Sequence, residues 1–283
     1  MNHPNPDFDT IFERIPQLRG MDSRDFKIRS LPGYTNQNFH LKNDRNDWVL
    51  RIPKQETNQY INRQFEAHNA DIAARLDIAP HCAWRDDSGL SLSMTLINTR
   101  CMIPADLHNE STASVLMKML KRLHGSETRF HGQVDLPGLL SRYYALVSTH
   151  RKQHIKSIYT RAQIKLEILT DGDNNLVSSH NDLVLENILI GDSQQIWIID
   201  WEYASMASPW WDLATLCNAA ELSYDESAKL LKIYQGEVSK TAQRLLVNYR
   251  YVLQVLSICW MAAFTETNVS RQIEKLPGNA GYP

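Results

Sequence analysis

The chain has 283 residues, of which 43% are hydrophobic and 22% are charged, and its formal net charge is -2. This composition is typical of a globular protein with a sizeable buried core, and the length suits two lobes or one large domain. The small net charge excludes a global basic field of the kind that recruits nucleic acid or an anionic membrane surface.

Cysteine usage and the apolar segments bear on the compartment. The four cysteines are scattered and form no Cys-x-x-Cys pair, which indicates free thiols in a reducing environment. The first nine residues lack the charged and then apolar pattern of a secretory signal. The most apolar segment, Tyr251–Phe264, is interrupted by polar residues and is too short to cross a bilayer. We therefore expect a cytoplasmic protein without a membrane partner.

The first third of the chain predicts a small α+β lobe that ends near residue 97. Alternating apolar residues between turn signals indicate strands, and apolar residues at helical spacing indicate helices. The expected elements are a helix at Phe8–Ile15, strands at Phe26–Leu31, Asn38–Leu41 and Trp48–Ile52, a helix from about Thr57 to Leu76, and strands at Cys82–Arg85 and Leu90–Ile97.

The remaining part, residues 98–283, predicts mostly helices, which one short hairpin interrupts. The expected helices are Ser114–Leu123, one or two within Leu139–Thr170, Trp211–Glu221, Asp225–Gln235 and Lys240–Thr265. The hairpin joins two apolar strands, Asn187–Ile190 and Gln195–Ile199, through a turn at Gly191–Ser193.

Three polar residues at the ends of the hairpin strands carry the strongest chemical signal. Asp182 precedes Asn187 by five residues, and Asp200 directly follows the second apolar strand. This is the pattern of kinase-type phosphoryl transfer, in which the first Asp accepts the proton of the attacking hydroxyl and the other two residues hold Mg²⁺. Asp and Asn are also common turn formers. Three such groups beside two fully apolar strands favour the catalytic interpretation.

The motifs around these residues resemble a known superfamily. They are His-Asn-Asp-Leu-Val-x-Glu-Asn-Ile-Leu at 180–189, Ile-Asp-Trp-Glu-Tyr-Ala at 199–204, Gly-Tyr-Thr-Asn-x-Asn-Phe at 33–39, Val-Leu-Arg-Ile-Pro at 49–53, Leu-His-Gly at 123–125 and Trp-Asp-Leu-Ala at 211–214. The sequence resembles the choline kinase and aminoglycoside phosphotransferase superfamily, and most closely its bacterial choline-kinase-like branch. The resemblance implies a bilobal protein-kinase-like fold of the α+β class, with a small β-rich N-terminal lobe, a mostly helical C-terminal lobe, and ATP with Mg²⁺ in the cleft.

For the nucleotide, the resemblance implies a set of ATP-binding positions in the N-terminal lobe: Gly33, Thr35, Asn36, Asn38, Arg51, Glu66, Thr95 and Ile97. A glycine-containing turn between two strands can bring backbone N–H groups onto phosphates, although Pro-Gly by itself is only a hairpin signal. Arg51 would take the role of the kinase lysine, with Glu66 as its ion-pair partner. Both residues could instead be surface charges. Backbone groups of 93–97 would bind adenine.

In the C-terminal lobe the resemblance implies structural support from His180 and Asp212 for the catalytic loop. Asp212 could equally be a charge at a helix N-terminus. It also implies that Tyr203 and Trp260 hold the acceptor beside Asp182, because a quaternary ammonium gains energy over an aromatic face. The family's second tryptophan position is Ala263 here, and core packing is an equal alternative for Trp260.

Three functions remain open at this point. The first is an ATP-dependent kinase of a small alcohol, with choline or a choline-like amino alcohol ahead of thiamine, ethanolamine and a sugar or aminoglycoside. The second is a nucleotide-binding scaffold without catalysis, which intact Asp182, Asn187 and Asp200 disfavour. The third is a protein kinase, which the missing Asp-Phe-Gly and Ala-Pro-Glu motifs disfavour.

Overall fold

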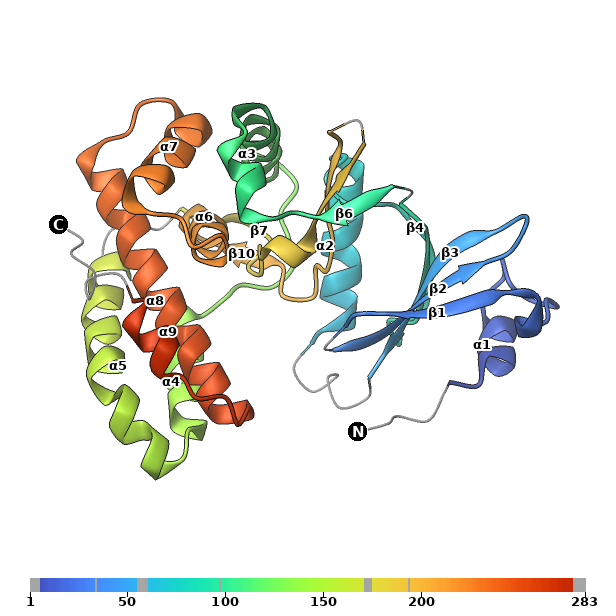
Figure 1. Ribbon diagram of the computed structural model, residues 1–283, viewed down its shortest axis with the longest axis horizontal. Helices are drawn as coiled ribbons and strands as arrows, with labels where there is room; N and C mark the ends of the chain where they lie inside the picture. Colours follow the sequence, from blue (N-terminus) through green and yellow to red (C-terminus); the bar gives the residue numbers. More distant parts are fainter. Residues whose placement is uncertain are drawn as a thin grey trace.

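A five-stranded antiparallel sheet with strand order β1-β2-β3-β5-β4 forms the N-terminal lobe (Figure 1). The structure, a computed structural model, describes residues 6–33, 35–54, 61–96, 98–170, 175–192 and 194–276. The strands of the sheet are β1 Lys27–Leu31, β2 Asn36–Lys42, β3 Asp47–Pro53, β4 Cys82–Arg85 and β5 Ser91–Met94. The predicted strands are thus confirmed, with ends shifted by up to three residues.

Helix α1, Phe8–Arg14, packs against this sheet and closes a small core. Asp7 caps the helix by accepting a hydrogen bond from the backbone N–H of Thr10. Phe12 from α1 is buried with Leu41 from β2 and Leu50 from β3. This core is separate from the larger one in the rest of the molecule, so the sheet and α1 form a packing unit of their own.

Helix α2, Arg63–Arg75, lies between the sheet and the C-terminal helices in Figure 1. The Asn62 side chain caps its N-terminus. The expected start at Thr57 falls within 55–60, outside the described residues, and Ile61 precedes the helix. The buried residues Ile72, Ala73 and Ala74 belong to the large core of the C-terminal lobe. The helix is therefore held by that lobe, although it follows the third strand in the chain.

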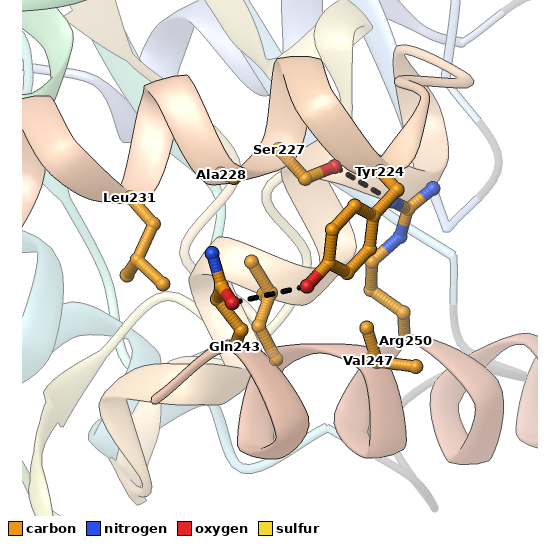
Figure 2. Close-up of a pocket in the computed structure, with 8 residues that line it drawn as sticks. Tyr224, Ser227, Ala228, Leu231, Gln243, Val247 and Arg250 are labelled. Carbon is orange, nitrogen blue, oxygen red and sulfur yellow. Dashed lines mark hydrogen bonds between the residues drawn. The ribbon is translucent and has the colours of Figure 1, made fainter. Parts of the chain in front are cut away.

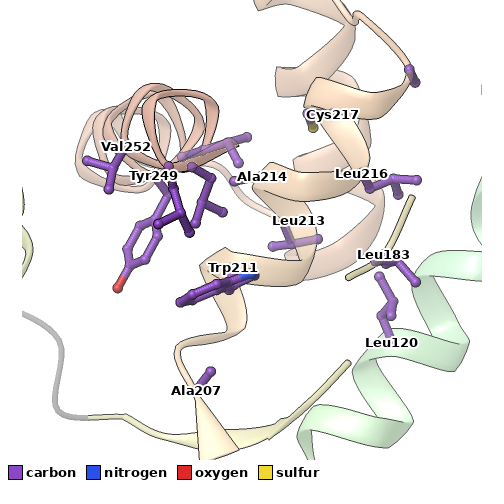
Figure 3. Packing of buried hydrophobic residues seen from close by; sticks show 14 of the residues in the cluster. Leu120, Leu183, Ala207, Trp211, Leu213, Ala214, Leu216, Cys217, Tyr249 and Val252 are labelled. Carbon is purple, nitrogen blue, oxygen red and sulfur yellow. The ribbon is translucent and has the colours of Figure 1, made fainter. Parts of the chain in front are cut away.

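The C-terminal lobe is mostly helical, as expected. Its helices are α3 Glu110–His124, α4 Leu136–Leu146, α5 Thr149–Thr170, α6 Pro209–Ala219, α7 Tyr224–Gln235, α8 Lys240–Phe264 and α9 Ser270–Glu274. Figure 3 shows how α6 is packed on two sides, with Trp211 and Leu213 near Leu183 and Leu120 and with Tyr249 and Val252 of α8 across the helix. Such all-round burial explains why α6 has almost no polar face.

A buried arginine ties three of these helices together. Arg250 of α8 donates to Asn218 Oδ1 on α6 at 3.0 Å and to Ser227 Oγ on α7 at 2.6 Å. Figure 2 shows Arg250 and Ser227 beside the small hollow between α7 and α8, where Tyr224 also donates to Gln243. None of these residues belongs to the predicted site, so their contacts serve the packing of the lobe.

Helix α8 is long and apolar enough, by length and composition, to cross a membrane. More than half of its most apolar window is buried inside the protein, as in the core helix of a globular domain. The length argument made for Tyr251–Phe264 is wrong, because the helix starts at Lys240. Burial of Val252 and Val255 against the lobe is the better reason to regard it as a core helix.

Short strands complete the C-terminal lobe near the interface with α2. The predicted hairpin is confirmed as β8 Ile188–Gly191 and β9 Ile196–Ile198, and Ser193 of its turn lies outside the described residues. A third strand, β6 Thr99–Cys101, pairs with β8, and β7 Val177–Ser179 pairs with β10 Ser205–Ala207. These three-residue strands were not predicted. The lobe boundary at 97 and 98 stays a prediction.

Candidate active site

The loop at His180–Asp182 is held by a buried carboxylate. Asp212 Oδ2 accepts from the backbone N–H of His180 at 2.9 Å, and Oδ1 accepts from that of Asn181 at 2.8 Å. His124 Nε2 donates to the same carboxylate at 3.0 Å. Burial alone would raise the pKa of Asp212, but the hydrogen bond and charge of His124 together with the other donors lower it. Asp212 therefore remains ionised in the core, at the place where it fixes the loop.

His180 uses both ring nitrogens for backbone contacts. Nε2 donates to the carbonyl of Ile199 at 2.9 Å, and Nδ1 accepts from the backbone N–H of Asp182 at 3.3 Å. The side chain is fully buried, and its ring packs edge-on against that of Trp201, with ring centroids 4.7 Å apart. These contacts join the His180–Asp182 loop to the segment that carries Asp200. His180 is therefore placed to orient the loop.

Asp182 and Asn187 lie side by side at the start of the hairpin. Asn187 Nδ2 donates to the backbone carbonyl of Asp182 at 2.9 Å and to its Oδ2 at 3.1 Å. This leaves Asn187 Oδ1 as its candidate metal-binding atom. Burial raises the pKa of Asp182; His180 opposes the shift and the charge of Asp200 adds to it. A carboxylate with a raised pKa is a better proton acceptor, which suits a general base.

Asp200 follows β9 in a left-handed backbone conformation, with φ of 65°. The backbone N–H of Ile199 donates to the carbonyl of Asn187 at 2.9 Å, so the hairpin brings Asp200 beside Asn187 as predicted from the chain order. A left-handed conformation is uncommon for a residue other than glycine, although Asp adopts it more readily than most residues.

Arg51 of β3 connects the two lobes through ion pairs. It pairs with Glu66 of α2, with Asp200 Oδ1 at 3.1 Å and with Glu202 Oε2 at 3.2 Å. The alternative of a surface charge is wrong for both Arg51 and Glu66, since the Arg51 side chain is 23% exposed and that of Glu66 is 8% exposed. The strand register places Asn38 directly opposite Arg51. The structure thus gathers residues from three distant parts of the sequence around one guanidinium group.

Glu202 belongs to this cluster and was not among the predicted site residues. Its Oε2 accepts from Thr35 Oγ1 at 2.8 Å and from Asn36 Nδ2 at 3.2 Å. Burial and the neighbouring charge of Asp200 raise its pKa to about 7, against the opposing effects of Thr35 and Arg51. The signal in the sequence that could have identified Glu202 is its spacing from Asp200, since the two acids are separated by a single apolar residue.

The turn before β2 depends on Gly33. A Cβ atom at this position would lie 2.6 Å from the carbonyl oxygen of Asn36 and 2.7 Å from Asn38 Nδ2, which no side chain tolerates. Asn38 Nδ2 donates to the carbonyl of Pro32 at 2.9 Å, so this predicted ATP-binding residue supports the turn itself. Tyr34 lies outside the described residues. Gly33 is therefore required by the tightness of the turn itself.

The predicted adenine-binding segment starts at the end of β5. The backbone N–H of Thr95 donates to the carbonyl of Asp47 at 3.2 Å, so this donor is already used in the structure. Met94 beside it is 66% exposed, although it is apolar. Ile97, the last predicted adenine contact, lies outside the described residues.

Aromatic side chains gather where α4, α8 and the Asp200 segment meet, and most of them are exposed. Trp260 and Phe264 of α8 have ring centroids 6.0 Å apart, and Tyr143 of α4 meets Phe264 edge-on at 5.9 Å. The pKa of Tyr203 is raised by partial burial and by the charges of Glu202 and Tyr143. Tyr203 therefore lies near Glu202 and Tyr143. Trp260 is 41% exposed, so it is not a core side chain. Its role towards an acceptor stays a prediction.

The acidic residues around Arg51 suit a hard cation. Among the described residues, one ligand oxygen from each of Glu66, Asp200 and Glu202 lies within 4.8 Å of the others. Carboxylate oxygens are the ligands that Mg²⁺ prefers. The donor set therefore fits Mg²⁺, with Asp200 as predicted and with Glu202 added.

Comparisons with known proteins identify relatives over most of the chain. A sequence profile described as Choline/ethanolamine kinase matches residues 28–271. Protein LicA of Haemophilus influenzae is 30% identical over 248 residues, which is 82% of this chain and 71% of that protein. Choline kinase LicA from Streptococcus pneumoniae has a similar structure, with a TM-score of 0.80 at 20% identity over 96% of this chain and 99% of the other. A structure of LicA in complex with AMP is also similar, with a TM-score of 0.77 at 20% identity over 99% of this chain and 100% of the other. The predicted bilobal fold is confirmed.

Proposed function

The chain belongs to the choline/ethanolamine kinase family of small-molecule kinases, and we propose that it transfers the γ-phosphoryl group of ATP to the hydroxyl of choline or a choline-like amino alcohol. The observation that carries this proposal is the convergence of Asp182, Asn187 and Asp200 where the two lobes meet. The AMP bound in the LicA structure supports an adenine nucleotide as the phosphoryl donor.

Asp182 is the proton acceptor in this proposal. Its raised pKa and its contact with Asn187 favour a carboxylate that takes the proton of the acceptor hydroxyl as the phosphoryl group arrives. His180 and Asp212 hold the loop so that the carboxylate keeps its orientation. Catalysis in such enzymes depends mainly on positioning and charge stabilisation, and fixed side chains supply both.

Arg51 and the acidic residues organise the nucleotide side. Asp200, Glu202 and Asn187 Oδ1 would hold Mg²⁺, which supplies positive charge to the phosphates when it is bound. Arg51 carries a guanidinium fork that matches phosphate oxygens. Since Arg51 contacts Asp200 and Glu202 now, its reorientation towards phosphates would free these carboxylates.

The acceptor pocket favours a cation. Tyr203, Trp260 and Phe264 present exposed aromatic rings, and the half-buried Tyr143 meets Phe264 edge-on. Aromatic faces attract a quaternary ammonium, and the nearby carboxylates of Asp200 and Glu202 add negative potential. Tyr143 and Phe264 replace the missing second tryptophan as walls of this pocket. Ethanolamine, thiamine and aminoglycosides are the alternative acceptors, and a catalytically inactive scaffold is the alternative function.

The proposed setting is the cytoplasm, with no nucleic-acid or membrane partner. All four cysteines are free thiols in the structure, as in proteins of reducing compartments. The small net charge of -2 offers no attraction to polyanions. The proposed partner is therefore the small alcohol itself.

ADP release measured over a panel of small alcohols tests the proposed function. The native protein with Mg²⁺ and choline should release ADP, and Asp182→Asn should lower turnover by about two to four orders of magnitude, the usual effect of a lost general base. The affinity for ATP should change little in this variant, because Asp182 faces the acceptor. Near-normal turnover of Asp182→Asn, or a native protein that uses no acceptor in the panel, would refute the proposal.

A further inference from the structure

Asn69 lies on α2 at the face that carries Glu66. The two residues are three positions apart, which places them on neighbouring turns of one helix face. The Asn69 side chain is fully buried. A buried amide has to satisfy its donor and acceptor atoms within the protein, so its partners show what it holds.

Every side-chain hydrogen bond of Asn69 in the described part of the chain reaches the backbone of the C-terminal lobe. Oδ1 accepts from the backbone N–H of His131 at 2.8 Å. Nδ2 donates to the carbonyl of His131 at 3.1 Å and to the carbonyl of Ala204 at 2.7 Å. One amide therefore joins α2 to two separate segments.

Both segments lead directly to the candidate active site. Ala204 closes a turn by donating its backbone N–H to the carbonyl of Trp201 at 3.1 Å, and this turn holds Glu202 and follows Asp200. The segment after His131 pairs with β10, because Met206 donates to the carbonyl of Gly132 at 2.9 Å. Strand β10 pairs with β7, which runs into His180.

Apolar and ring contacts around Asn69 pack α2 against the C-terminal lobe. The His68 ring stacks on the His131 ring at 3.6 Å, and Phe65 meets His131 edge-on at 5.5 Å. Apolar packing is not directional and allows small sliding movements. The three hydrogen bonds of Asn69 are directional, so they fix how far α2 lies along the lobe.

We propose that Asn69 is a positioning residue that sets the separation between Glu66 on α2 and the segment of Asp200 and Glu202. This inference rests on the proposed function, because the separation matters where Arg51 bridges the two sides. A displacement of about 1 Å at a reacting site can cost about a hundredfold in rate. Asn69 acts through Glu66 and Asp200 and touches neither nucleotide nor acceptor.

The experiment compares Asn69→Leu with the matched variant Asn218→Leu. Asn218 also bridges two elements, donating to the Arg250 carbonyl at 2.9 Å and accepting from Arg250 Nε at 3.0 Å. Both variants should lower the melting temperature, because both lose hydrogen bonds that join two elements and are at least partly buried. Asn69→Leu alone should lower kcat, by about 10–100-fold, the usual effect of losing a residue that orients ligands. Its KM for the acceptor should stay unchanged.

Calorimetry of ATP binding with Mg²⁺ provides a readout besides activity. Asn69→Leu should weaken this binding by roughly tenfold, whereas Asn218→Leu should not. If Asn69→Leu does not fold, Asn69→Asp replaces it, because the carboxylate still accepts from His131 but cannot donate to Ala204. Native kcat and ATP affinity in the variant that folds, or equal losses in the Asn218 control, would overturn the inference. A native protein that phosphorylates no acceptor would refute the proposed function instead, and the calorimetric comparison would still report on Asn69.

Discussion

Replacing Asp212 with Asn should destabilise the protein strongly, although the two side chains have the same shape. The carboxylate accepts from two backbone N–H groups and from His124 Nε2, and it is fully buried. An amide can present its oxygen to the side that receives His180 and His124, but its NH₂ group then faces the N–H of Asn181. The variant loses one hydrogen bond to a charged group and leaves a buried N–H without an acceptor.

The expected loss follows from these two changes. A hydrogen bond to a charged group contributes about 1.5–3 kcal/mol, and an unsatisfied buried donor costs about 1–3 kcal/mol. We therefore expect a loss of about 2.5–6 kcal/mol, which lowers the melting temperature by roughly 5–24 °C for a chain of this size. Scanning calorimetry measures this difference. The control is Asp71→Asn, because Asp71 is 52% exposed in its pair with Arg85 and should cost less than about 1 kcal/mol.

The pH dependence supplies an independent check on the charge of Asp212. Its pKa in the folded protein lies below the ordinary value, because the hydrogen bonds outweigh burial. A depressed pKa contributes stability above the unfolded pKa, and this stability is lost as the pH falls through the folded pKa. The advantage of the native protein over Asp212→Asn should thus be full at neutral pH and shrink below about pH 4. A change in melting temperature under 2 °C at pH 7, within the ordinary scatter of surface substitutions, would refute this reasoning.

Two further predictions concern ligand binding. Asp200→Ala should abolish the Mg²⁺ dependence of ATP binding in calorimetry, because it removes a charged metal ligand; an unchanged Mg²⁺ dependence would mean that the metal lies elsewhere. Trp260→Ala should weaken the apparent affinity for choline by about 0.5–2 kcal/mol, up to roughly thirtyfold, and leave that for ATP unchanged. Ile168→Ala, at an exposed apolar residue on α5, is its control, and equal use of choline and its neutral carbon isostere would argue against a cationic pocket.

Local sequence patterns predicted the parts of the fold whose residues contact one another within a short stretch. Helix α3 has an apolar stripe at helical spacing, and the hairpin of β8 and β9 joins two apolar runs across a short turn. Strands β6, β7 and β10 have three residues each, which is too short for an alternating pattern to be recognised. They form because distant segments supply their partners, and the partner is what a local pattern lacks.

The placement of α2 shows the same limit for the candidate site. The sequence order assigns this helix to the N-terminal lobe, yet Ile72 and Ala73 pack in the core of the C-terminal lobe. Asn69 looks like an ordinary polar residue of a helix, because its partners His131 and Ala204 lie 62 and 135 positions further along the chain. Side-chain chemistry at such a position depends on the tertiary fold, and propensity describes only the helix itself.

Arg51 explains why a motif can be recognised before its geometry is known. The residues Asp182, Asn187 and Asp200 stand close together in the sequence, so their spacing alone indicates phosphoryl transfer. Arg51 precedes Asp200 by 149 positions, and only the fold brings its guanidinium within 3.1 Å of that carboxylate. The same arginine meets Glu66 and Glu202, so a shift of α2 would alter the charge around Asp200 without changing any residue of the motif. The motif therefore identifies the chemistry, whereas the position of α2 determines whether the groups that perform it meet.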